Sequence, residues 1–196
     1  MKTSRSTSDE FAAPAGPAAG RLLLDEKQVA AALDHLCRSI LPELPAEGRL
    51  AVIGMRTRGE TLAARIVERL HKARKGLAVD RGVLDITFYR DDLSRRRGAP
   101  LVRATEIDFD LNDAWVLLVD DVLQTGRSVR AAMDAIHDFG RPGVVRLAVL
   151  IDRGGRELPI SADFVGKKLK APADLRVQVQ LKENDGEEGV WIIPSS

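Results

Sequence analysis

The sequence of 196 residues contains very little cysteine and few aromatic residues. Cys37 is the only cysteine, which excludes an intramolecular disulfide and a cysteine-based zinc site. Aromatic residues make up only 4% of the chain, so the core must be built mainly from aliphatic side chains. This length leaves room for one domain with a sizeable core.

The sequence also lacks a long apolar run and a large excess of charge of either sign. No stretch approaches the roughly 20 apolar residues of a membrane-spanning helix, and residues 1–20 contain no apolar segment typical of secretory signals. We therefore expect a cytoplasmic protein. A formal net charge of +1 argues against a protein that coats polyanions over its whole surface, but it allows a local basic face.

The first 20 residues differ in composition from the rest of the chain. They are rich in Ser, Thr, Ala, Pro and Gly, which predicts a disordered tail over 1–20 before a domain over 21–196. Asp25 is predicted to cap the first helix, in which Cys37 repeats with other apolar residues at helical spacing. His35 lies two positions away, on a different side of that helix, so we expect packing for Cys37 and not a nucleophile paired with a base.

The most informative stretch runs from Trp115 to Ser128. Its apolar beginning predicts a buried parallel strand, and such strands place ligands just beyond their carboxyl ends, where Asp120 and Asp121 follow. Gly126 then allows a tight turn into a helix, whose first N–H groups suit a phosphate. Two carboxylates beside a phosphate loop match a ribose phosphate. The alternative is that the acids only cap the helix or lie in solvent, which does not explain two carboxylates leaving an apolar strand.

Two further predicted strands, 49–53 and 144–151, end in glycine-containing loops. The first loop, 54–59, carries Arg56, Thr57 and Arg58 and suits a pyrophosphate group. The second begins at Asp152, and its main-chain groups could form hydrogen bonds with a planar base. If the strands are parallel neighbours, all these loops meet at one edge of the sheet.

The alternation of apolar and polar residues from Leu84 to Tyr89 predicts another strand. A polar and basic segment follows, which we interpret as a mobile lid that excludes water from a reactive sugar cation. A solvated connection between two strands is an equally good interpretation. The candidate lid residues are Arg90, Asp91, Arg95, Arg96 and Arg97.

The stretch from Trp115 to Ser128 resembles the phosphoribosyl pyrophosphate (PRPP) signature of the type I phosphoribosyltransferases. This resemblance implies an α/β fold with a mostly parallel central sheet flanked by helices. It also implies a small hood subdomain, formed by the N-terminal segment and residues around 152–180. It makes Asp120 and Asp121 the catalytic pair at the ribose hydroxyls. The implied PRPP- and nucleotide-binding residues are Arg56, Thr57, Arg58, Val122, Leu123, Gln124, Thr125, Gly126, Arg127 and Ser128.

Several separate motifs resemble the PyrR family of pyrimidine operon attenuation regulators, which are also uracil phosphoribosyltransferases. They are 89–93, 119–123, 140–142, 152–160 and 163–167, in the family's order. The resemblance implies conversion of uracil and PRPP to UMP and pyrophosphate, with Mg²⁺ held mainly by PRPP oxygens near Asp120 and Asp121. It also implies uracil binding at Ile151, Asp152 and Arg153, and a homodimer or homotetramer.

Regulatory members of this family bind the leader of pyrimidine mRNA in response to UMP or UTP. The residues that the resemblance assigns to RNA are Arg38, Arg141, Arg146, Arg156 and Lys167. Asp34, Gly155 and Ser161 depart from the family pattern and should weaken contact with a phosphate backbone, so we expect RNA attenuation to be reduced or absent.

Gln124 is a further departure, because purine enzymes commonly have Asp and PyrR proteins usually have Tyr at this position. Glutamine cannot act as a general base, which argues against a purine substrate. Two alternatives stay open: a nucleotide-sensing RNA-binding regulator with little catalysis, and a phosphoribosyltransferase for another base.

Overall fold

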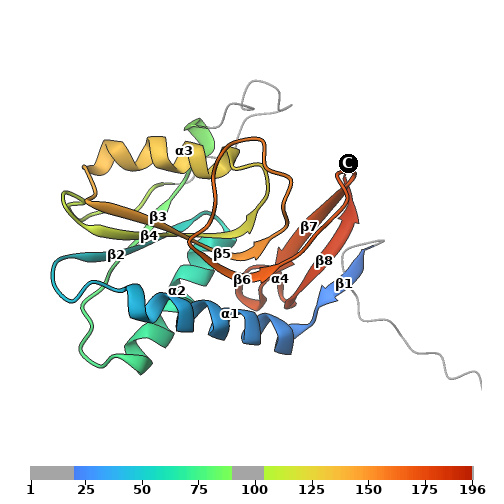
Figure 1. Cartoon of the computed structure of the whole chain (residues 1–196), viewed down its shortest axis with the longest axis horizontal. Helices are drawn as coiled ribbons and strands as arrows, with labels where there is room; N and C mark the ends of the chain where they lie inside the picture. The colour runs from blue at the N-terminus through green and yellow to red at the C-terminus, as the bar shows by residue number, and fades with distance from the viewer. Residues whose placement is uncertain (1–19, 90–103, 196) are drawn as a thin grey trace, which may run out of the picture.

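The computed structural model describes residues 20–89 and 104–195 (Figure 1). In this part of the chain, five parallel strands form the central sheet in the order β3-β2-β4-β5-β6. The strands are β2 (Leu50–Met55), β3 (Asp80–Leu84), β4 (Trp115–Leu123), β5 (Val144–Asp152) and β6 (Phe164–Lys168). This confirms the predicted α/β class.

Helices cover both faces of the central sheet. In Figure 1, α1 (Glu26–Ile40) and α2 (Arg58–Ala73) lie on one face, and α3 (Arg127–Ile136) lies on the other. Successive strand residues alternate between two cores: Leu117 and Val119 pack with α1 and α2, whereas Val116 and Leu118 pack with α3. Burial on both faces explains why the central strands are apolar throughout.

A second sheet lies beside the first and joins the two ends of the described chain. It has the order β1-β8-β7, with β1 (Arg21–Leu24), β7 (Leu175–Gln180) and β8 (Gly189–Pro194), and the short helix α4 (Lys182–Asp185) connects β7 to β8. The expected hood, formed by the N-terminal segment and residues around 152–180, includes β1 and β7 of this sheet. Strand β6, within the same bounds, joins the central sheet, and β8 lies beyond residue 180. Strand β6 has five residues and β7 and β8 have six each, so the pattern of such short strands does not assign them to one sheet or the other.

The first helix begins where the sequence predicts. The Asp25 side chain accepts a hydrogen bond from the Gln28 N–H at 2.8 Å, and the Gln28 side chain accepts one from the Asp25 N–H at 3.0 Å, which completes a capping box. Cys37 is buried, and desolvation raises the pKa of its thiol to about 11. The thiol is therefore protonated at neutral pH, which supports the predicted packing role.

The prediction of a strand over residues 84–89 is wrong. Strand β3 ends at Leu84, and residues Thr87–Tyr89 form a 3-10 helix. The Asp85 carboxylate accepts hydrogen bonds from the N–H and the hydroxyl of Thr87. This local turn competes with strand pairing and ends the extended segment. Two other 3-10 helices follow longer helices, at Leu41–Glu43 and His137–Phe139.

Candidate active site

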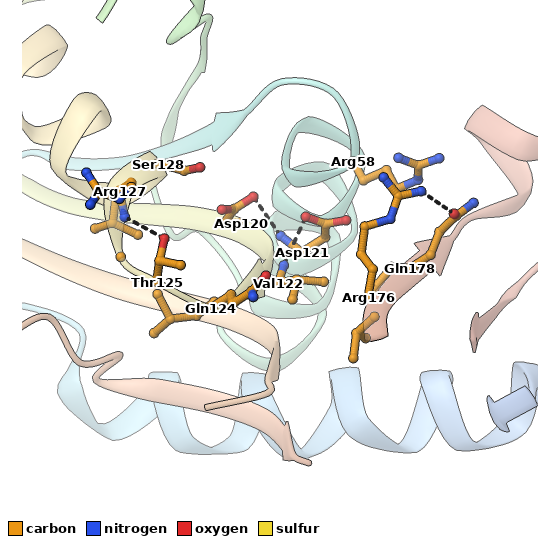
Figure 2. A pocket seen from close by; sticks show the side chains of 15 residues that line it. Arg58, Asp120, Asp121, Val122, Gln124, Thr125, Arg127, Ser128, Arg176 and Gln178 are labelled. Atoms are coloured by element: carbon orange, nitrogen blue, oxygen red, sulfur yellow. Dashed lines mark hydrogen bonds between the residues drawn. The ribbon is translucent and has the colours of Figure 1, made fainter. Parts of the chain in front are cut away.

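The carboxyl ends of β2, β4 and β5 meet at one edge of the central sheet. Gly54 pairs with Val119, and Leu123 pairs with Asp152, so the loops that follow the three strands lie beside one another. A cavity of about 560 Å³ opens there (Figure 2). Its walls come from Arg58 of α2, from residues 120–129 and from residues 176–179 of β7. The predicted convergence is therefore present.

Two glycines allow α2 to begin almost in contact with the strand ends. A Cβ atom on Gly59 would lie 2.5 Å from the Val119 carbonyl oxygen and 3.3 Å from Asp120 Cα. A Cβ atom on Gly54 would lie 2.5 Å from the Gly59 oxygen and from Glu60 Cα. These distances leave no room for larger residues, so the two glycines bring the loop at 54–59 next to the acidic pair.

Asp120 and Asp121 line the cavity (Figure 2). They lie inside β4 and not beyond it, because the strand continues to Leu123. One oxygen of each carboxylate accepts a main-chain N–H at 2.9 Å, from Asp121 and Val122 respectively. Asp120 is buried, with 9% of its surface exposed. Burial raises the pKa of Asp121, and the nearby Arg58 guanidinium opposes this rise. The pair is therefore fixed in orientation by the main chain.

The loop from Gln124 to Ser128 leads into α3. Gly126, with a positive φ of 90°, is the N-cap residue of α3. The first N–H groups of a helix have no carbonyl partner within the helix itself. The Thr125 hydroxyl accepts the Arg127 N–H at 3.3 Å. The Thr125 carbonyl accepts the N–H groups of Glu157 and Leu158, both at 3.0 Å. This helix start suits an anion, because its partial positive charge faces the cavity.

The two arginines of the first loop differ in position. Arg58 lines the cavity and forms a bidentate pair with Asp185 of α4, with Nε–Oδ2 and Nη2–Oδ1 distances of 3.0 and 2.6 Å. Arg56 instead donates to Glu106 at 2.5 Å. The peptide bond between Arg56 and Thr57 is cis. Of the two candidates for pyrophosphate, Arg58 is thus the one that lines the cavity.

The side chains of the expected uracil residues do not line this cavity. Ile151 is fully buried in the core. Asp152 pairs with Arg156 at 2.7 Å; burial acts to raise the pKa of Asp152, but Arg156 and the Gly154 N–H outweigh it, so this pKa is lowered. Arg153 is buried and donates to the carbonyls of residues 171, 172 and 175. These side chains hold the segment in place. Its main chain is also used within the protein, because the Arg153 N–H donates to the Leu123 carbonyl at 3.1 Å and the Asp152 carbonyl accepts the Leu169 N–H at 2.8 Å.

Sequence reasoning missed the wall contributed by β7. Arg176 and Gln178 lie on it beside Arg58, and the Arg176 Nη2 donates to Gln178 Oε1 at 3.0 Å (Figure 2). Both alternate with the buried Val177 and Val179. This alternation predicts a strand with one polar face, but it does not say which site that face borders.

The structure describes the residues predicted to bind RNA but not those predicted to form the lid. Residues 90–97, with the whole predicted lid, lie outside the described part of the chain. Arg38, Arg141 and Lys167 are exposed. The other two RNA candidates have protein partners: Arg146 pairs with Asp163 at 3.0 Å, and Arg156 donates to the Gln124 carbonyl at 2.9 Å. Arg156 therefore also stabilises the loop at the cavity.

Residues 20–89 and 104–195 contain no cluster of three or more His, Cys, Asp and Glu side chains that could hold a metal ion. The two carboxylates of Asp120 and Asp121 fit an ion that takes most of its ligands from a bound phosphate compound. None of the helices in the described part of the chain is both long enough and apolar enough to cross a membrane.

Comparisons with known proteins identify the family of this chain. The family model described as "Phosphoribosyl transferase domain" matches residues 22–180. A protein of Clostridioides difficile named "Bifunctional protein PyrR" is 46% identical over 170 residues, which cover 87% of this chain and 96% of the relative. A protein of the same name from Deinococcus radiodurans is 49% identical, over 84% of this chain and 89% of the relative.

Solved structures support the fold at lower identity. The hypoxanthine phosphoribosyltransferase of Trypanosoma cruzi is 16% identical with a TM-score of 0.65, and the match covers 90% of this chain and 97% of the other. A hypoxanthine-guanine phosphoribosyltransferase from Bacillus anthracis is 15% identical with a TM-score of 0.63, over 88% and 98% of the two chains. From the family model and the close relatives together, this chain belongs to the phosphoribosyl transferase domain family and, within it, to the PyrR family.

Proposed function

We propose that this protein is a uracil phosphoribosyltransferase, which converts uracil and PRPP to UMP and pyrophosphate. The observation that supports the proposal is that Asp120, Asp121, the start of α3 and Arg58 line the same cavity. These groups match the three parts of PRPP: a ribose with two hydroxyls, a 5′-phosphate and a pyrophosphate.

Each group has a distinct task in the proposed reaction. The start of α3 and the loop at 124–128 hold the 5′-phosphate with main-chain N–H groups. Asp120 and Asp121 accept hydrogen bonds from the ribose hydroxyls, and their negative charge favours the positive charge that develops at C1 as pyrophosphate leaves. Arg58 neutralises the departing pyrophosphate. When bound, Mg²⁺ supplies further positive charge at the pyrophosphate oxygens, with Asp120 and Asp121 as its protein neighbours.

The choice of uracil rests on Gln124, which lines the cavity, and on the family. Gln124 cannot take a proton from a purine ring, whereas uracil ionises more readily at its reacting nitrogen. In this proposal uracil lies beside residues 151–153, as the family resemblance implies. The side chains of Asp152 and Arg153 and the Arg153 N–H have partners within the protein and keep this segment in place.

Formation of UMP from uracil and PRPP tests the proposal, with hypoxanthine and orotate as competing bases. We expect UMP to be the main product, and the variant D120N/D121N to lose activity while it keeps its far-UV circular dichroism. Faster turnover of hypoxanthine or orotate would assign another base. No product from any base, with PRPP still bound, would favour a sensor without catalysis.

A second function, binding of pyrimidine leader RNA in response to UMP, is favoured by the groove between α1 and β6. His35, Lys167 and Lys168 line this groove. Asp34, which we expected to repel RNA, pairs with Arg69 at 2.9 Å, so its charge is partly compensated. Gel-shift titration against the cognate leader, with and without UMP, measures this function. Tight UMP-stimulated binding would refute the expected loss of RNA attenuation.

A further inference from the structure

Helix α4 is attached to α2 by a row of polar side chains. Arg58, Thr61 and Arg65 lie on one face of α2, since they are three and four residues apart. Arg58 pairs with Asp185, Thr61 donates to Asn184 at 2.7 Å, and Arg65 pairs with Glu183 and Glu188. The turn between β7 and β8 is therefore fixed to the helix that begins at the cavity.

One of these contacts differs from the others, because its arginine lines the cavity. Asp185 binds Nε and Nη2 of Arg58 side-on, and the Leu181 N–H donates to Asp185 Oδ2 at 2.9 Å. The Asp185 side chain is only 15% exposed. The turn that contains Asp185 therefore orients this carboxylate independently of Arg58.

The side-on pair leaves donors of Arg58 for a ligand. A guanidinium has five N–H donors, and Asp185 uses one on Nε and one on Nη2. The remaining donors, on Nη1 and Nη2, belong to a side chain that borders the cavity next to Asp121 (Figure 2). Without Asp185, a long arginine side chain would sample several rotamers and would have to be ordered when the ligand binds.

We propose that Asp185 is a positioning residue for the pyrophosphate end of PRPP, because it fixes the orientation in which Arg58 meets this group. The inference rests on the proposed function. It adds a residue of α4, the connection between β7 and β8, to a site whose walls come from the central sheet and from β7. Asp185 itself does not contact PRPP in this proposal and acts only through Arg58.

The test compares kinetic constants of D185N, D185E and E183Q with those of the unchanged protein. We expect D185N to raise KM for PRPP about tenfold or more, with kcat and KM for uracil changed less than about threefold. D185E, which keeps the charge, should recover part of the loss. E183Q is the matched control, because Arg65 keeps Glu188 as a partner, and its KM for PRPP should not change.

A double-mutant cycle separates positioning from a structural role. If Asp185 acts through Arg58, then R58A and R58A/D185N should have the same KM for PRPP. Additive losses, an unchanged or lowered KM in D185N, or an equal loss in E183Q would overturn the proposal. Titration calorimetry with PRPP alone repeats the comparison without turnover. If the unchanged protein binds PRPP but forms no UMP, the proposed function fails while the role of Asp185 is still measured.

Discussion

Asp121 combines a functional position with an unfavourable environment. Partial burial raises the pKa of its carboxylate, and the Arg58 guanidinium compensates only part of that cost. A charge in such an environment reduces the stability of the folded state. A cost of this kind is typical of residues that the function requires.

We therefore expect D121N to lose activity at least about a hundredfold but to unfold at the same or a higher temperature at pH 7. The pKa is raised on folding, so the destabilising effect is absent below the ordinary value of 3.8 and grows as pH rises above it. Thermal unfolding of both proteins from pH 3.5 to pH 7 measures this. A D121N protein that is less stable than the unchanged protein at pH 7 would contradict the expectation.

Arg153 is a cation in the interior, and in the described part of the chain its hydrogen-bond partners are carbonyl oxygens. It donates at 2.7 Å to residue 175 and at 3.2 and 3.0 Å to residues 171 and 172. Its position beside the expected base site invites a catalytic interpretation, but its contacts indicate that it ties the end of β5 to the start of β7.

R153A should lower the free energy of unfolding by about 3 kcal/mol, because it removes hydrogen bonds from a charged donor to three partly buried carbonyls. R153K should recover little, since one ammonium group cannot reproduce the planar fork of arginine. Urea unfolding gives both values. A stable R153A protein with only a raised KM for uracil would instead assign the side chain to the base.

At the scale of elements, the start of α2 depends on the absence of a side chain. Alanine is a better helix former than glycine by about 1 kcal/mol, so G59A should stabilise α2 if only propensity mattered. We expect the opposite, a loss of about 2 kcal/mol and of most activity, because the new Cβ would lie 2.5 Å from the Val119 oxygen. E68A, at the exposed C-terminal half of α2, is the control. Unfolding and UMP formation are the measurements.

The elements that the sequence predicted correctly are those whose determining residues lie close together in the sequence. The start of α1 was predictable because Asp25 and Gln28 satisfy each other within one turn. The central strand and its acidic end were predictable because both faces of β4 are buried and apolar. The strand at 84–89 was predicted wrongly, since an alternating pattern does not reveal that Asp85 bonds to Thr87.

The missed parts of the site are those that depend on distant contacts. Asp185 follows Arg58 by 127 positions, and no local pattern joins them. The same holds for Arg176, which reaches the cavity through the second sheet. The resemblance to a family identified the loops that follow β2, β4 and β5, but it did not identify the side chains that support them.

At the scale of the whole molecule, the two sheets are joined through α2 and α4. Arg65 is the centre of this contact: its side chain is 17% exposed, and that of its partner Glu188 is 7% exposed. Two hydrogen bonds to Glu188, at 2.8 and 2.7 Å, complete the pair.

R65A should therefore lower the free energy of unfolding by about 3 kcal/mol, because Glu188 would stay buried without its cation. K72A should cost less than about 0.5 kcal/mol, because the pair of Lys72 with Glu68 is exposed. Hydrogen exchange should show faster opening of β7 and β8 in R65A. Equal effects of the two substitutions would contradict a structural role for the buried pair.

The pairing of β1 with β8 places Leu22 opposite Trp191, and β7, which forms one wall of the cavity, pairs with β8 as well. This wall therefore depends on segments that lie far apart in the sequence. During translation the central sheet can assemble while β8 is still inside the ribosome, but the second sheet cannot close. A nascent chain halted before Gly189 should therefore be unable to retain PRPP. Competence for the ligand would arise in one step, when β8 joins β1 and β7.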